Sequence, residues 1–188
     1  MKRMFVWSVL VLVIPSLVAC SGGDSTGGVV NDGGGSSTLS ASFVPDMPSP
    51  GPGTVSLQQG SASRNLVTVD ALVTDVSGVC SAGFDLVFNP AQAEFVGSSA
   101  GEMLESGGVG VDYSAAVVGT NRVVIGVSRI GGGACTDAVG SERLVRLTFR
   151  VIRAGSSAVA IENADLFDDQ IQSAAGLTWA AGSISAVD

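Results

Sequence analysis

The segment from residue 82 to residue 98 constrains the fold of this chain more than any other. Between 82 and 89, phenylalanine and leucine alternate with aspartate, valine and asparagine, which is the pattern of a β-strand with one buried face. Asn89-Pro90 ends that strand, because proline has no N–H to donate to a neighbouring strand and its ring holds φ at about −65°. A second short strand is predicted at 93–98. Three of the seven phenylalanines lie here, so the unit is expected to supply much of the aromatic core.

Alternating patterns of this kind run from Thr54 to the end of the chain. Many short strands separated by glycine-rich turns predict an all-β domain over 54–188, folded as a nine-stranded antiparallel β-sandwich. A short helical turn is expected at 101–105. The nine strands are predicted at 54–59, 65–75, 82–89, 93–98, 111–118, 121–130, 142–153, 157–163 and 177–187.

Residues 1–19 have the organisation of an export signal. Lys2 and Arg3 precede an apolar run that is too short to span a bilayer, and Leu-Val-Ala-Cys follows at 17–20. This ending resembles a bacterial lipoprotein signal, which implies cleavage before Cys20 and acylation of that cysteine. The alternative is an ordinary secretory signal in which Cys20 has no role.

An acylated Cys20 would anchor the protein in the cell envelope, because two acyl chains are enough for stable membrane attachment. Ser21 follows the cysteine, which favours the outer membrane in a host with two membranes. Residues 20–53 are rich in glycine, serine and proline and are predicted to be a flexible tether. A coil of that length spans roughly 30 Å.

The charge of the chain limits its partners. The formal net charge is −8, and removal of residues 1–19 would take away Lys2 and Arg3 but no acid, leaving a net charge near −10. Binding to a nucleic-acid backbone depends on clusters of lysine and arginine, which this sequence lacks. We therefore expect no nucleic-acid partner.

Cys80 and Cys135 are the two cysteines within the predicted domain. Two cysteines in an exported chain usually form a disulfide. The alternatives are two free thiols or a pair of metal ligands. The chain has no histidine, which speaks against a zinc site.

The sequence offers little catalytic chemistry. Without histidine there is no Ser/His or Cys/His pair, and the glycines at 131–133 do not lead into a helix as a phosphate-binding loop would. Carboxylates lie close together at 102–105 and 168–169, but neither pair is placed across a cleft by any pattern. Aspartates 165, 168 and 169 could bind Ca²⁺ together with backbone carbonyls, but they do not have EF-hand spacing. We expect neither an enzyme nor a cofactor.

Four segments together resemble the cohesin family. The strand ending at Asn89-Pro90 is similar to a cohesin's third strand, and the segment from 144 to 151 has the form L-x-x-L-x-F-x-V of a later one. Segments 157–166 and 179–187 are similar to the strands that close the module. The resemblance covers about 54–187 and implies a jelly-roll topology.

Cohesins bind dockerins, which are small calcium-loaded modules on other proteins. The resemblance therefore implies an exported partner with a dockerin-like module, and any calcium is expected on that partner. The binding face would be built from the strands at 157–163, 82–89, 121–130 and 111–118. Cellulosomal cohesins often carry polar residues where this chain has Ser-Ala-Gly at 81–83. The residues expected on this face are Gly83, Asp85, Val87, Tyr113, Ser128 and Ile130.

Two other functions fit the same fold class, because function depends on the surface of a sandwich. The domain could bind polysaccharide, although sugar platforms usually use a row of exposed aromatics. Beyond the signal, only Trp179 and Tyr113 are candidates besides phenylalanine. The protein could also be a structural envelope lipoprotein without a specific partner.

Overall fold

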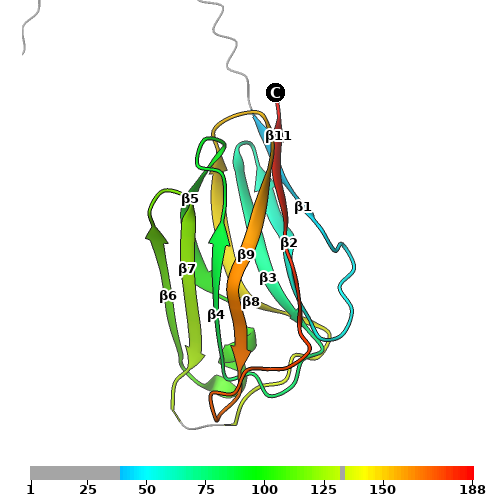
Figure 1. Ribbon diagram of the computed structural model, residues 1–188, viewed down its shortest axis with the longest axis vertical. Helices are drawn as coiled ribbons and strands as arrows, with labels where there is room; N and C mark the ends of the chain where they lie inside the picture. Colours follow the sequence, from blue (N-terminus) through cyan, green and yellow to red (C-terminus); the bar gives the residue numbers. More distant parts are fainter. Residues whose placement is uncertain (1–38, 132–133) are drawn as a thin grey trace, which may run out of the picture. The chain divides into compact units, whose positions relative to one another are not determined.

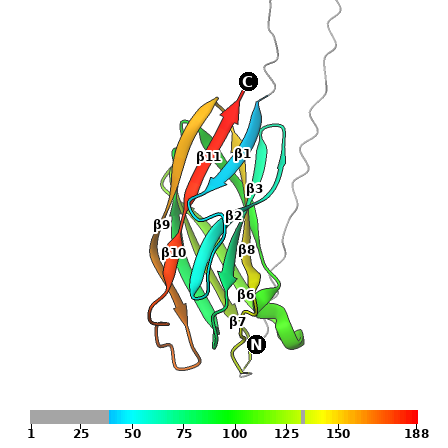
Figure 2. The ribbon, with the colours of Figure 1, turned by 90° about the vertical axis from the view of Figure 1, so that its right-hand side faces the viewer.

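The structure is a computed structural model that describes residues 39–131 and 134–188. The predicted signal peptide, Cys20 and the tether as far as residue 38 lie outside the described residues. Two β-sheets pack face to face (Figures 1 and 2). No helix in the described part of the chain has the length and apolar character needed to cross a bilayer. The elements are β1 (Ser40–Pro45), β2 (Thr54–Ser63), β3 (Leu66–Thr74), β4 (Ser81–Val87), β5 (Ala93–Ala100), the 3-10 helix η1 (Met103–Gly108), β6 (Val111–Val118), β7 (Arg122–Arg129), β8 (Ser141–Val151), β9 (Gly155–Phe167), β10 (Thr178–Ala180) and β11 (Gly182–Val187).

The predicted all-β sandwich with jelly-roll topology is confirmed, but the predicted number of nine strands is wrong. Eleven strands are described, because a strand precedes Thr54 and the segment 177–187 divides into β10 and β11. The sandwich is also not wholly antiparallel, since β10 pairs parallel with β2.

The additional strand β1 corrects the predicted boundary of the tether. Ser40–Pro45 pairs antiparallel with β11 and buries Ala41 and Phe43. Exposed or half-exposed residues alternate with buried ones along β1, as in a strand with one buried face. The surrounding glycine, serine and proline are nevertheless typical of a linker. The sandwich therefore begins at Ser40, not at Thr54.

The six-stranded sheet has the order β1-β11-β9-β4-β7-β6, and the five-stranded sheet has the order β10-β2-β3-β8-β5. The four strands that the sequence assigned to one face are thus consecutive neighbours, β9, β4, β7 and β6. In Figure 1 they lie side by side at the front of the molecule.

The core lies between the two sheets. Phe84, Leu86 and Phe88 are buried as the alternation predicted, and so is the inner face of β8. Phe149 of β8 lies at the centre, with its ring edge-on to Phe88 and Phe95 at centroid distances of 5.5 and 5.8 Å. Edge-to-face packing of this kind adds about 0.5–1.5 kcal/mol per pair to the burial of the rings.

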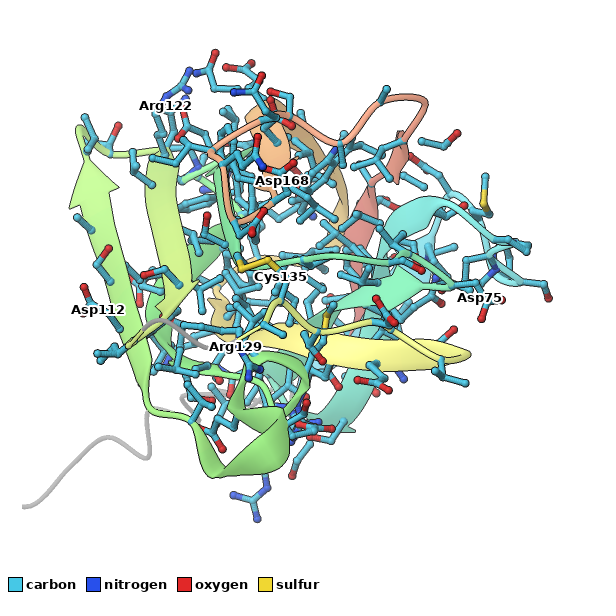
Figure 3. The ribbon with its side chains drawn as sticks, turned by 90° about the horizontal axis from the view of Figure 1, so that it is seen from below. Asp75, Asp112, Arg122, Arg129, Cys135 and Asp168 are labelled. Carbon is cyan, nitrogen blue, oxygen red and sulfur yellow. A yellow bond between two sulfur atoms is a disulfide. The ribbon has the colours of Figure 1, made fainter. Side chains whose placement is uncertain are left out.

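The predicted disulfide is confirmed. Cys80 and Cys135 are bonded, with their Cα atoms 4.5 Å apart (Figure 3). The backbone next to the bond is also paired, because the N–H groups of Val79 and Thr136 each donate to the other residue's carbonyl oxygen at 2.8 and 3.0 Å. The loop after β7 is therefore held against the start of β4.

Residues Ser36–Asp188 form one compact unit. It contains all the described strands and the buried side chains that they share. Because the described core lies within it, we expect this unit to fold on its own.

Candidate functional site

The outer surface of β9, β4, β7 and β6 is the candidate site, and the positions of its side chains follow from strand pairing. In β4 and β7, alternate residues point into the core, so the intervening ones point outward. Most outward residues are small, which makes the face shallow. They are Ser81, Gly83, Asp85 and Val87 on β4, Arg122, Val124, Gly126 and Ser128 on β7, and Asp112, Ser114, Ala116 and Val118 on β6.

A polar cluster occupies the part of this face where β4, β7 and β9 run side by side. Arg122 donates from its two terminal nitrogens to Asp85 of β4 at 2.5 Å and to Glu162 of β9 at 2.6 Å. Asn163 donates its side-chain amide to the same Asp85 oxygen at 2.7 Å. We name these four residues the Asp85 cluster. One arginine thus joins three neighbouring strands.

The Asp85 cluster keeps a buried carboxylate charged. Hydrogen bonding from Asn163 and the charged Arg122 together hold the pKa of Asp85 below its usual value, although burial acts in the opposite direction. Glu162 and Asp85 in turn raise the pKa of Arg122. The cluster has one more negative than positive charge, and Asp112 and Asp165 on the same face add to it. The face is therefore acidic.

Apolar side chains lie beside the cluster. Val118 on β6 and Val124 on β7 are 52% and 39% exposed, and Ala116 is exposed between them. Val118 pairs across the strands with Arg122, and Val124 pairs with Asp85. Exposed apolar residues around charged groups that are partly shielded from water are typical of protein-binding surfaces.

A shallow depression lies farther along the face, toward the start of β4. Its volume is about 250 Å³, and its lining includes Gly83 and Gly126. The other lining residues include three serines, Asp112 and Phe167. The absence of side chains beyond Cα at the two glycines allows a docked backbone to approach the sheet closely.

Most residues predicted for the partner-binding face lie on it. Gly83, Val87 and Ser128 point outward, and Ile130 is exposed just beyond the end of β7. Asp85 also points outward, but it is buried beneath its hydrogen-bond partners and is not free as the prediction implied.

The placement of Tyr113 on this face is wrong. Tyr113 points toward the core, and its outward neighbour is Asp112. Its hydroxyl is buried and makes no hydrogen bond among the described residues, although the Ser98 side chain lies nearby. Burial raises the pKa of the phenol. The Gly-Val-Gly sequence before β6 contains no pattern that shows which residues of β6 face the core.

Sequence reasoning missed Arg122, Glu162 and Asn163. Arg122 was visible as a cation at the start of a strand in an acidic chain, but its partners lie 37 and 40 residues away and no local pattern links them. Asn163 reaches Asp85 because the register of β9 against β4 shifts between Gly83 and Asp85. Its φ of 49° is in the left-handed region, which asparagine tolerates better than most residues. Such a bulge is not visible in the sequence.

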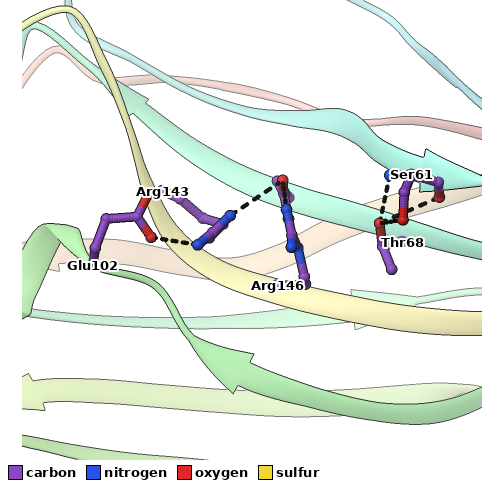
Figure 4. Close-up of polar contacts among 6 residues, drawn as sticks. Ser61, Thr68, Glu102, Arg143 and Arg146 are labelled. Atoms are coloured by element: carbon purple, nitrogen blue, oxygen red, sulfur yellow. Dashed lines mark hydrogen bonds and ion pairs between the residues drawn. The ribbon is translucent and has the colours of Figure 1, made fainter.

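The other sheet carries a second set of charged contacts, which hold the fold together. Arg146 of β8 donates two hydrogen bonds of 2.7 Å to Asp70 of β3. Arg143 lies 3.9 Å from the same carboxylate and 2.6 Å from Glu102 (Figure 4). Glu102, one of the two carboxylates at 102–105, is thus paired with a cation.

The three aspartates considered for calcium do not converge. Asp165 accepts a hydrogen bond from the Ser173 hydroxyl, and Asp168 accepts bonds from the backbone N–H groups of Gln170 and Gln172. Within residues 39–131 and 134–188, no group of three or more potential metal-ligating side chains is present. Asp165 and Asp168 thus hold the turn that follows β9.

The aromatic residues considered for sugar binding face inward. Trp179 is half-buried, and its ring packs against Phe84 at a centroid distance of 5.8 Å. Tyr113 also points to the core. Neither residue contributes to an exposed aromatic row on the described surface.

Comparison with known proteins identifies the fold. No protein-family model matches the chain, and no curated protein matches it. Solved structures do match. A type II cohesin domain from the cellulosome of Acetivibrio cellulolyticus has 14% identity and a TM-score of 0.52, with 79% of this chain and 95% of that chain covered. The domain has a cohesin-like fold.

Two further structures agree with this cohesin-like fold. CaCohA2 from Clostridium acetobutylicum has 14% identity and a TM-score of 0.54, with 70% of this chain and 88% of that chain covered. The third cohesin ScaC from Acetivibrio cellulolyticus, solved in complex with the ScaB dockerin, has 14% identity and a TM-score of 0.53, covering 63% and 86%.

Proposed function

We propose that this protein is a non-catalytic adaptor whose cohesin-like domain recruits an exported partner that carries a dockerin-type module. The partner would dock on the outer surface of β9, β4, β7 and β6. The observation that carries this proposal is the Asp85 cluster with the exposed Val118 and Val124 beside it, on the flat face of a cohesin-like sandwich.

Each part of that surface has a distinct role in docking. Val118 and Val124 supply apolar area that a partner can remove from water, at about 25 cal/mol per Å². Arg122 is only partly exposed and already fixed by two carboxylates, so little side-chain entropy is lost when a partner covers it. The small residues around Gly83 and Gly126 leave room for a partner's backbone.

The acidic character of the face favours a basic partner surface. Asp85, Glu162, Asp112 and Asp165 outnumber Arg122. Complementary charge increases the association rate and makes it fall as salt is added. A partner module with lysine or arginine next to an apolar residue would meet both the cluster and the valines.

We also propose that Cys20 is acylated after cleavage of residues 1–19 and that the protein is attached to the outer membrane by this lipid. The Leu-Val-Ala-Cys sequence and the following Ser21 support this part of the proposal. Mass spectrometry of the protein purified from membranes tests it. An N-terminal peptide that begins at Cys20 and carries acyl chains is expected, whereas a peptide beginning before Cys20 would contradict it.

The recruitment proposal is tested by capture. The Ser36–Asp188 unit is immobilised and exposed to the host's exported proteins, once with calcium and once with a chelator. A dockerin-bearing protein is expected to be retained only with calcium, because the dockerin is the calcium-loaded component. Retention that does not depend on calcium, or retention of no dockerin-bearing protein, would refute the recruitment of a dockerin.

A matched pair of variants places the interaction on the proposed face. Val124→Asp adds a charge beside the Asp85 cluster, and Val96→Asp adds the same charge at a valine of similar exposure (47%) on β5 of the other sheet. Val124→Asp is expected to weaken capture at least about tenfold, since it buries an unpaired charge in the interface. Val96→Asp should bind like the original protein. Equal effects from both variants would exclude the face as the binding site.

A further inference from the structure

The edge strands of the two sheets differ in how well they are protected from pairing with another chain. The edges of the described sheets are β1 and β6 in one sheet and β10 and β5 in the other. An edge strand presents unpaired N–H and C=O groups, and natural proteins protect such edges with proline, charge, a bulge, short length or a covering segment.

Strand β1 is protected by hydrogen bonds and by proline. The backbone N–H of Ala41 donates to the carbonyl oxygen of Arg64 at 2.7 Å, and that of Phe43 donates to the side chain of Gln59, also at 2.7 Å. Both acceptors lie outside the six-stranded sheet. The strand ends at Pro45, which has no N–H to offer.

The two edges of the five-stranded sheet are protected in other ways. Strand β10 has only three residues. Strand β5 is interrupted by an irregularity between Phe95 and Gly97, and it carries the charged Glu94. Each of these features discourages the addition of a further strand.

Strand β6 lacks most of these protections. It has eight residues, pairs with β7 without any shift of register, and contains no proline, lysine or arginine. Its single charge is Asp112, near one end. Near the other end, Val117 and Val118 are each 52% exposed. In Figure 1 no other strand lies beyond β6.

We propose that β6 pairs antiparallel with β6 of a second copy of this chain, about a two-fold axis at Ala115. Opposite residues in an antiparallel pair point the same way, so this register joins outer face to outer face. A shift by one residue would join an outer face to an inner one. The pairs are Ala115 with Ala115, Ser114 with Ala116, Tyr113 with Val117, and Asp112 with Val118 of the other copy.

The proposed register avoids placing like charges of the two β6 strands opposite each other. The chain carries a net charge of −8, so most contacts between two copies bring acidic groups together. In the proposed register, no two acidic residues of β6 are opposed. Asp112 lies across from Val118 of the other copy, and Val118 pairs in its own sheet with Arg122. Asp112 would thus lie about two strand spacings, roughly 10 Å, from the other copy's Arg122, a distance of about one Debye length at 0.1 M salt. Since that arginine is already paired with Asp85 and Glu162, its attraction for Asp112 is small.

The apolar contacts agree with the same register. Val117 points toward the inner side of the sheet but is half-exposed because no strand lies next to it. The aromatic ring of Tyr113 from the other copy would lie opposite it, and aromatic and β-branched residues form favourable cross-strand pairs. The two-fold axis supplies this contact twice.

The dimer would present two partner-binding faces on the same side of a continuous twelve-stranded sheet, because the axis is perpendicular to the sheet. Self-association through β6 does not depend on the identity of the partner. One strand from each copy makes a small interface, so the dimer is expected to be weak and reversible.

Sedimentation equilibrium of the Ser36–Asp188 unit over low to high micromolar concentrations tests this inference. A reversible monomer–dimer equilibrium is expected. Val117→Lys should weaken it by about tenfold or more, because the charge enters the interface twice. Val96→Lys on β5 is the matched control and should leave the equilibrium unchanged. Ala116→Lys, at an exposed position, repeats the test if Val117→Lys does not fold.

Two results would overturn the inference. One is a monomer at every concentration. The other is a dimer that neither β6 lysine weakens, since that dimer would use a different surface. Hydrogen exchange gives an independent measurement, because amides of β6 are expected to exchange more slowly as concentration rises while amides of β5 are unaffected.

Discussion

Replacing both Cys80 and Cys135 with serine is expected to destabilise the Ser36–Asp188 unit by about 4 kcal/mol. The disulfide joins residues that are 55 positions apart. For a closed loop of that size, the chain-entropy model gives a reduction of about 14 cal/mol/K in the entropy of the unfolded chain, which is about 4 kcal/mol at 25 °C.

In the chain-entropy model this loss arises in the unfolded state, and the contacts of the folded loop are consistent with that model. The backbone pairing of Val79 with Thr136 and the hydrogen bond between the Ser106 and Thr136 hydroxyls at 3.0 Å do not need the disulfide. The folded variant should therefore keep its loop in place. For a domain of this size, a loss of 4 kcal/mol corresponds to a fall in Tm of roughly 8–16 °C.

Urea unfolding of the oxidised protein and of the double serine variant measures the effect. The variant should unfold at lower urea and with a larger m-value, because its unfolded chain is less compact. The reduced original protein is the control and should behave like the variant. A loss below about 1 kcal/mol would refute the reasoning and would mean that the loop is already constrained in the unfolded chain.

Asp85→Asn should make the free energy of unfolding depend less on pH at acid pH. Hydrogen bonding from Asn163, opposed by burial, lowers the pKa of Asp85 in the folded state. The stabilisation from Asp85 is therefore present above its unfolded-state pKa of about 3.9 and is lost as the pH falls through its folded-state pKa. Urea midpoints between pH 2 and 6 measure this, and an unchanged acid limb would contradict it. Tyr113→Phe should keep or raise the free energy of unfolding, because it removes a buried hydroxyl without a hydrogen bond. A loss of more than about 1 kcal/mol in that free energy would show that the hydroxyl has a partner. Gly101→Ala should destabilise by about 1–3 kcal/mol, since its Cβ would lie 2.1 Å from the Arg143 carbonyl oxygen; an unchanged urea midpoint would exclude that close contact.

The sandwich was predictable from the sequence because each strand leaves a local pattern. The alternation around Phe84 predicted its burial, and the proline after Asn89 predicted where the strand ends. The disulfide was predicted from two cysteines in a chain whose first residues have the organisation of an export signal. Strand β1 was missed because its serines and proline are equally typical of a linker, and only its pairing with β11 makes it a strand.

The candidate site was predictable as a set of strands but not as a set of contacts. Family resemblance placed β9, β4, β7 and β6 together, and the structure confirms that order. The Asp85 cluster depends on partners about 40 and 80 residues apart in sequence and on a bulge at Asn163. These are consequences of register, which a single sequence does not specify.

The most direct measurement is a hydrogen-exchange comparison of the Ser36–Asp188 unit alone and with a calcium-loaded dockerin module from an exported protein of the same host. Slower exchange is expected in β9, β4, β7 and β6, with β2, β3, β8 and β5 unchanged. The protection should be lost in Val124→Asp and kept in Val96→Asp. Protection confined to the five-stranded sheet, or no protection by any calcium-loaded dockerin of that host, would contradict the proposed partner-binding face.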